Sequence, residues 1–166
     1  MLRYLGTIVA TAIVVLFLLV SALPLMHWFR AEARTAMLDE SRSLWAGLGL
    51  DDYAFVLEME CDCEGVPAGA VRVSVRADQP LMAEAPPGGE RIPLPVAPAF
   101  PATVDAMFDA IATLIDEAPA VLDVSYDENY GLPREIYVDP DTDVPGDETR
   151  IRVTAFDPRA AADEPA

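Results

Sequence analysis

Lysine is absent from this chain of 166 residues, and histidine occurs once, as His27. Without lysine there is no side-chain amine for Schiff-base catalysis. His27 lies at the end of a hydrophobic segment, which excludes histidine-based acid–base and triad chemistry from the rest of the chain. Cys61 and Cys63 have no histidine to complete a zinc site. We therefore expect the protein not to be an enzyme.

Positive charge is also scarce, because 11 arginines stand against 28 acidic residues and the formal net charge is −17. Phosphate binding draws on clustered positive charge, so the composition excludes nucleic acid as a partner. Such acidity is typical of a highly soluble surface or of cation-rich surroundings, and a specific cationic partner is the alternative. The hydrophobic content of 52% predicts a folded domain rather than a disordered chain.

The N-terminal segment contains no charged residue from Leu5 to Met26. As a helix this run would span roughly 33 Å, about the thickness of a bilayer core. We predict a single-pass transmembrane anchor within residues 1–30 that contacts the membrane through residues 5–26. The C-terminal domain would then lie outside the cytoplasm, in the periplasm or the extracellular space. Small residues up to Ala22 favour the alternative of a cleaved signal peptide and a secreted domain.

Hydrophobic periodicity predicts an α+β fold after this segment. Residues 31–50 favour a juxtamembrane helix, with Leu44 and Trp45 capping the core. A second, amphipathic helix is expected over residues 103–117, beginning at the cap residue Thr103. Alternating hydrophobic and polar residues predict strands over residues 53–60, 71–76, 81–84, 121–126, 134–139 and 150–156, with a turn over 77–80.

This order of elements predicts one domain over residues 51–156, in which an antiparallel sheet packs one face against one main helix, preceded by an N-terminal transmembrane helix. Residues 86–101 contain six prolines and predict an exposed loop. Residues 157–166 consist mostly of alanine, proline and acidic residues and predict a disordered tail.

The pair Cys61 and Cys63 is the most distinctive local motif. Residues two apart in a strand point to the same face, so the two sulfur atoms can meet. The structural interpretation is a disulfide that acts as a local clip at the end of the strand, or two unreactive thiols. The alternative is a redox function, in which an exposed, reducible pair exchanges with a partner thiol.

Two loops carry further candidate residues. In the acidic loop 139–148, Asp139, Asp141 and Asp143 could converge on calcium, although the spacing departs from that of the hand-type calcium loop, and a solvated turn is the default. The loop between two predicted strands is a structural turn or a binding loop. Its candidate residues are Tyr126, Asp127, Tyr130, Gly131 and Pro133.

Several short motifs follow one another along the domain. They are Asp52-Tyr53-Ala54-Phe55, Cys61-Asp62-Cys63, Thr103-Val104-Asp105-Ala106-Met107-Phe108, Tyr126-Asp127-Glu128-Asn129-Tyr130-Gly131-Leu132-Pro133, Asp139 and Asp147-Glu148. In combination they resemble a family of small bacterial secreted or membrane-attached proteins known only as a domain of unknown function, over residues 41–156. The resemblance implies an exported bacterial α+β domain and implies no activity.

We therefore predict a membrane-anchored extracytoplasmic module that binds an unidentified protein or small molecule and needs no cofactor. A thiol–disulfide redox protein using Cys61 and Cys63 is the first alternative. A calcium-dependent module using the acidic loop 139–148 is the second.

Overall fold

The computed structural model describes residues 31–85 and 89–158. The chain divides into two units, residues 1–36 and 37–166, and residues 31–36 of the first unit are helical. The predicted anchor within residues 1–30 lies outside the described residues, as do positions 86–88 and 159–166. No helix in the described part of the chain is both long and apolar enough to cross a membrane.

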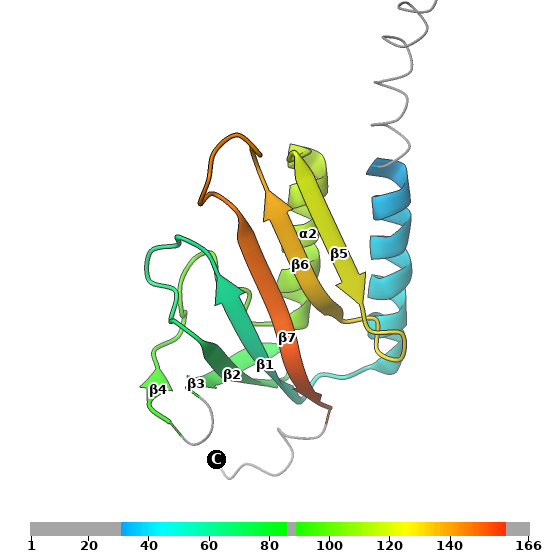
Figure 1. Cartoon of the computed structure of the whole chain (residues 1–166). Coiled ribbons are helices and arrows are strands. Elements are labelled where there is room, and N and C mark those ends of the chain that lie inside the picture. The colour runs from blue at the N-terminus through cyan, green and yellow to red at the C-terminus, as the bar shows by residue number, and fades with distance from the viewer. Residues whose placement is uncertain (1–30, 86–88, 159–166) are drawn as a thin grey trace, which may run out of the picture. The chain divides into compact units, whose positions relative to one another are not determined.

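Seven antiparallel strands form one sheet in the order β4-β3-β2-β1-β7-β6-β5 (Figure 1). They are β1 (Tyr53–Glu60), β2 (Ala70–Arg76), β3 (Gln79–Glu84), β4 (Arg91–Ile92), β5 (Val121–Tyr126), β6 (Pro133–Asp139) and β7 (Thr149–Asp157). Because β1 pairs with both β2 and β7, the first and last strands of the domain lie side by side in the middle of the sheet.

The helix α2 (Val104–Glu117) covers one face of this sheet (Figure 1). Its buried residues are spaced three or four apart and form one stripe: Val104, Met107, Phe108 and Ile111. The Thr103 side chain accepts a hydrogen bond from the N–H of Ala106 at 3.0 Å, and the helix ends at Ala118, just before Pro119. The prediction of this helix is confirmed, because its stripe and both of its ends are local signals.

A second helix, formed by residues 37–48 in the domain unit, packs beside α2. Leu38 and Trp45 are buried, and the Trp45 ring lies 5.1 Å from that of Tyr53, edge to face. The helix predicted over residues 31–50 is present over 31–48, so the sheet carries two helices rather than one main helix. The prediction that Leu44 caps the core with Trp45 is wrong for Leu44, which is 40% exposed. Successive helical residues point about 100° apart, so only one of the two can face the sheet.

Tyr53 joins the sheet to the start of α2. Its side chain is fully buried, and its hydroxyl oxygen accepts a hydrogen bond from the backbone N–H of Val104 at 3.1 Å. That N–H belongs to the first turn of α2, where it has no partner within the helix. Burial is the main cause that raises the pKa of Tyr53, to about 12. The hydroxyl therefore stays protonated and fixes the position of α2 over β1.

The predicted strands are confirmed, with differences at their ends. The turn predicted over 77–80 is shorter, because Ala77 and Asp78 alone have positive φ values, 49° and 58°, and β3 already begins at Gln79. Pro80 fits in β3 because the register between β2 and β3 shifts at that point. The predicted tail is wrong at its first residue, since Asp157 is the last residue of β7.

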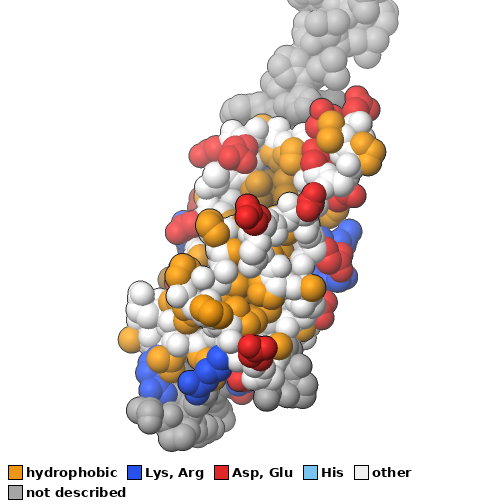
Figure 2. All heavy atoms as spheres, turned by 90° about the vertical axis from the view of Figure 1, so that its left-hand side faces the viewer, with side chains coloured by type: hydrophobic (Ala, Val, Ile, Leu, Met, Phe, Trp, Pro, Cys, Tyr) orange, Lys and Arg blue, Asp and Glu red, His pale blue; other side chains and the backbone are white. Residues whose placement is uncertain are grey.

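The proline-rich segment 86–101 is not an uninterrupted loop. Arg91 and Ile92 pair with Glu84 and Ala83 of β3, because this dipeptide contains no proline and keeps its N–H donors. Further along, Ala97 and Phe100 are buried in the hydrophobic core. The side of the molecule that carries β3 and β4 exposes hydrophobic side chains along its middle (Figure 2).

Candidate functional site

The loop between β5 and β6 is organised by the carboxylate of Asp127. Its Oδ1 accepts hydrogen bonds from the N–H groups of Asn129 and Tyr130, both at 2.9 Å, and its Oδ2 accepts from Arg134 at 2.8 Å. Burial raises the pKa of Asp127, but these hydrogen bonds and the Arg134 charge outweigh it and hold the pKa below 3.8. Both carboxylate oxygens of Asp127 thus accept hydrogen bonds that hold the loop in place.

The same loop contacts the helix of residues 37–48 at Gly131. This glycine has a φ of +74°, and a Cβ built on it would lie 2.3 Å from the carbonyl oxygen of Ser41. The two tyrosines of the loop also point into the domain: the Tyr126 ring stacks on Phe108, and the Tyr130 ring lies 4.9 Å from that of Phe156. Pro133 is buried at the start of β6. These contacts favour a structural turn over a binding loop.

Cys61 and Cys63 form a disulfide just after β1, with their Cα atoms 5.3 Å apart, which agrees with the first of the two structural interpretations of this pair. The nearest residues in the chain are acidic: Glu60, Asp62 and Glu64. Neighbouring carboxylates disfavour a thiolate, which is the form that attacks disulfides. The surroundings therefore lend the redox alternative no support, and it stays a prediction.

The acidic loop forms turns of its own. The Oδ1 of Asp141 accepts a hydrogen bond from the N–H of Asp143 at 3.1 Å, which is local turn chemistry. Partial burial and the carboxylates of Asp147 and Glu148 raise the pKa of Asp139. Throughout the described ranges, no group of three or more acidic, cysteine or histidine side chains is arranged to hold a metal ion. The calcium alternative stays a prediction without geometric support.

The face of the sheet opposite the helices carries charged side chains of both signs. The guanidinium of Arg152 lies between Glu58, at 3.6 Å, and Glu60. On the same strand, Arg150 pairs with Glu135 of β6. Strand residues two apart point to the same face, so β7 presents both arginines together on this open face.

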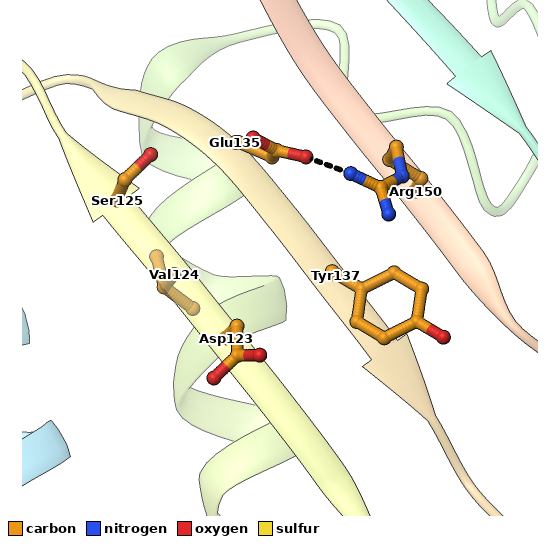
Figure 3. Close-up of a pocket in the computed structure, with 6 residues that line it drawn as sticks. All are labelled: Asp123, Val124, Ser125, Glu135, Tyr137 and Arg150. Atoms are coloured by element: carbon orange, nitrogen blue, oxygen red, sulfur yellow. Dashed lines mark hydrogen bonds and ion pairs between the residues drawn. The ribbon is translucent and has the colours of Figure 1, made fainter. Parts of the chain in front are cut away.

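Two adjoining depressions lie on the open face. The first has a volume of about 530 Å³ and is lined by Asp123, Val124, Ser125, Glu135, Tyr137 and Arg150 (Figure 3). The second, of about 410 Å³, is lined by Glu60, Cys61, Asp62, Tyr137, Gly146, Glu148 and Arg150. Tyr137 and Arg150 belong to both, so they form the boundary between the two. We call this region the acidic groove.

Tyr137 and Arg150 face each other across neighbouring strands. They are paired residues of β6 and β7, and the guanidinium carbon of Arg150 lies 4.8 Å from the centre of the Tyr137 ring. Arg150 also donates a hydrogen bond to Glu135, the residue two before Tyr137 (Figure 3). An arginine of the protein itself is therefore held in the groove by an aromatic ring and a carboxylate.

The charge of the groove is strongly unbalanced. Asp123 and Glu135 line the first depression, and Glu60, Asp62 and Glu148 line the second, against the guanidinium of Arg150 within the groove and that of Arg152, which pairs with Glu60. Sequence reasoning did not single out Tyr137 or Arg150, because the groove assembles from strands distant in the chain. The sequence signal that could have indicated this surface is the alternation of charged and hydrophobic residues along β6 and β7.

Together the fold and this surface define a small α+β domain whose antiparallel sheet has one face under two helices and an acidic groove on the other. The chain belongs to a family of unknown function, DUF6174, whose model matches residues 37–158. This match confirms the resemblance to a family of unknown function, while bacterial origin and export stay predictions. Comparisons with curated proteins and with solved structures give no match.

Proposed function

We propose that this protein is a membrane-anchored, extracytoplasmic interaction module that binds a cationic segment of a partner protein in its acidic groove. The observation that carries the proposal is the groove itself, in which carboxylates from four parts of the chain line two depressions that meet at Tyr137. Residues 5–26 would hold the domain at the membrane, and the domain would act without catalysis.

Charge complementarity supports this class of partner. The net charge of −17 draws cations toward the whole molecule and raises the rate of encounter with a basic segment. Within the groove, the carboxylates can pair with arginine or lysine side chains, and the tyrosine ring offers a face for a cation. The groove is also a depression on a sheet surface, which suits an extended segment of a protein.

Binding of a fluorescein-labelled hexa-arginine peptide to the full chain in neutral detergent tests the proposal. Fluorescence anisotropy would be followed at about 150 mM salt, where long-range attraction is largely screened. The test variant is the double substitution Asp123→Asn and Glu148→Gln, one carboxylate from each depression. The matched control is Asp39→Asn with Glu40→Gln, which removes the same charge from the helix on the other side of the sheet.

We expect the groove variant to bind the peptide about tenfold more weakly than the unaltered chain, since each exposed charge pair contributes up to about 1 kcal/mol. The control variant should change the affinity by about twofold or less. Equal losses in both variants would show that only net charge attracts the peptide. Absence of binding in the unaltered chain would also contradict the proposal.

A further inference from the structure

We infer that Glu135 and Tyr137 form a subsite for a guanidinium group, that Arg150 fills this subsite in the unbound protein, and that an arginine of the partner displaces it. The inference rests on the proposed function and deepens it, because it names the side chain that is recognised and the step that admits it. Arg150 would act as an internal competitor for the partner's arginine.

The pairing geometry explains why Arg150 occupies the subsite. Arg150 and Tyr137 are directly opposed across β6 and β7, and the Arg150 side chain places its guanidinium over the Tyr137 ring. Glu135 lies on the same face of β6 and accepts a hydrogen bond from the same guanidinium. Ring and carboxylate thus meet the two preferences of a guanidinium, which stacks on aromatic faces and donates in its own plane.

Arg150 can leave the subsite without losing charged partners. Its side chain is 38% exposed and that of Glu135 is 39% exposed, so water already reaches the ion pair and weakens it. Arg150 also lines the second depression, together with Glu60 and Glu148. Because Glu60 already pairs with Arg152, a rotation of the side chain toward Glu148 would keep its charge compensated and would open the face of Tyr137.

The same chemistry favours arginine over lysine in the partner. The ammonium of lysine is compact and strongly hydrated, and it has no planar surface to lay on the ring. A lysine segment would therefore be attracted by the carboxylates of the groove but would compete poorly with Arg150 for the subsite. We expect hexa-arginine to bind the full chain at least fivefold more tightly than hexalysine of the same net charge.

Removal of the internal competitor gives the sharpest test, with both peptides titrated against the full chain in neutral detergent. Arg150→Gln should strengthen hexa-arginine binding about tenfold, because the cation–π contact and the ion pair no longer have to be broken. Arg72→Gln is the matched control, since it removes the same charge from β2 of the same sheet, from a guanidinium that pairs with Glu84 and lines neither depression. It should change binding about twofold.

The ring is tested in the Arg150→Gln background. Tyr137→Phe should keep the gain in affinity, since it retains the aromatic face, whereas Tyr137→Leu should abolish it. Equal gains from Arg150→Gln and Arg72→Gln would overturn the inference, because charge alone would then explain both. Weaker binding by Arg150→Gln would overturn it too. If no variant binds either peptide, the proposed function itself fails, which is a different result.

Discussion

Substitution of Gly131 by alanine should detach the β5–β6 loop from the helix formed by residues 37–48. Gly131 has a φ of +74°, and a Cβ at this position would lie 2.3 Å from the carbonyl oxygen of Ser41, closer than real Cβ contacts come. That oxygen belongs to the backbone of the helix, so no side-chain rotation can relieve the overlap. Either the loop or the helix must move.

The expected cost has two parts. Alanine in the left-handed region costs about 1–2 kcal/mol relative to its normal conformations. Forcing packed elements apart adds about 1–3 kcal/mol, because Leu38 and Trp45 of the helix are buried against the core. We therefore expect Gly131→Ala to lower the free energy of unfolding by about 2–5 kcal/mol, a large share of the stability of a small domain.

Urea unfolding of the full chain, followed by far-ultraviolet circular dichroism, measures this cost. Gly49→Ala is the matched control, because Gly49 also has a positive φ, +59°, but a Cβ added there would meet no atom within 4 Å. It should therefore cost only the conformational part, about 1–2 kcal/mol. If the two variants are equally stable, the loop does not press on the helix and the reasoning is refuted.

Three further substitutions test the scaffold by urea unfolding. Asp127→Asn should cost about 1–2 kcal/mol at neutral pH. Because folding lowers the pKa of Asp127 from 3.8, the ionised carboxylate stabilises the fold above that pH, and this stabilisation is lost as the pH falls through the folded-state pKa. The difference in stability between the variant and the unaltered chain should therefore vanish in strong acid. Replacing both Cys61 and Cys63 by serine should leave the fold intact and cost about 1.5 kcal/mol from loop entropy, and a complete loss of folding would contradict the role of a local clip. Tyr53→Phe should cost about 1–3 kcal/mol because it leaves the buried N–H of Val104 without a partner, and an unchanged midpoint would show that another acceptor replaces the hydroxyl.

The elements of the fold could be predicted because their signals are local. The apolar stripe of α2, its cap at Thr103 and its end before Pro119 lie within 17 consecutive residues. The alternation in β1 marks its buried face within eight residues. The side-chain period of two is enough to say which residues of a strand face the core, whatever strand lies beside it.

The strand order and the groove could not be predicted in the same way. β1 pairs with β7, and Ala54 lies opposite Asp157, a contact between residues about a hundred positions apart. No local pattern encodes such a pairing, so the meeting of Glu60 with Tyr137 and Arg150 in one depression was not foreseeable. Leu44 was predicted to face the core and does not, because the hydrophobicity of one residue does not say which side of a helix meets the sheet.

A map of backbone amide chemical shifts tests the central claim most directly. The full chain in neutral detergent would be titrated with hexa-arginine, and the amides that shift would be placed on the sheet. The account predicts that shifts concentrate in β6, in β7 and around Glu148, with the largest changes near Tyr137 and Arg150 on the acidic groove. Shifts that concentrate on α2 or on residues 37–48, or a spectrum that does not change, would contradict it.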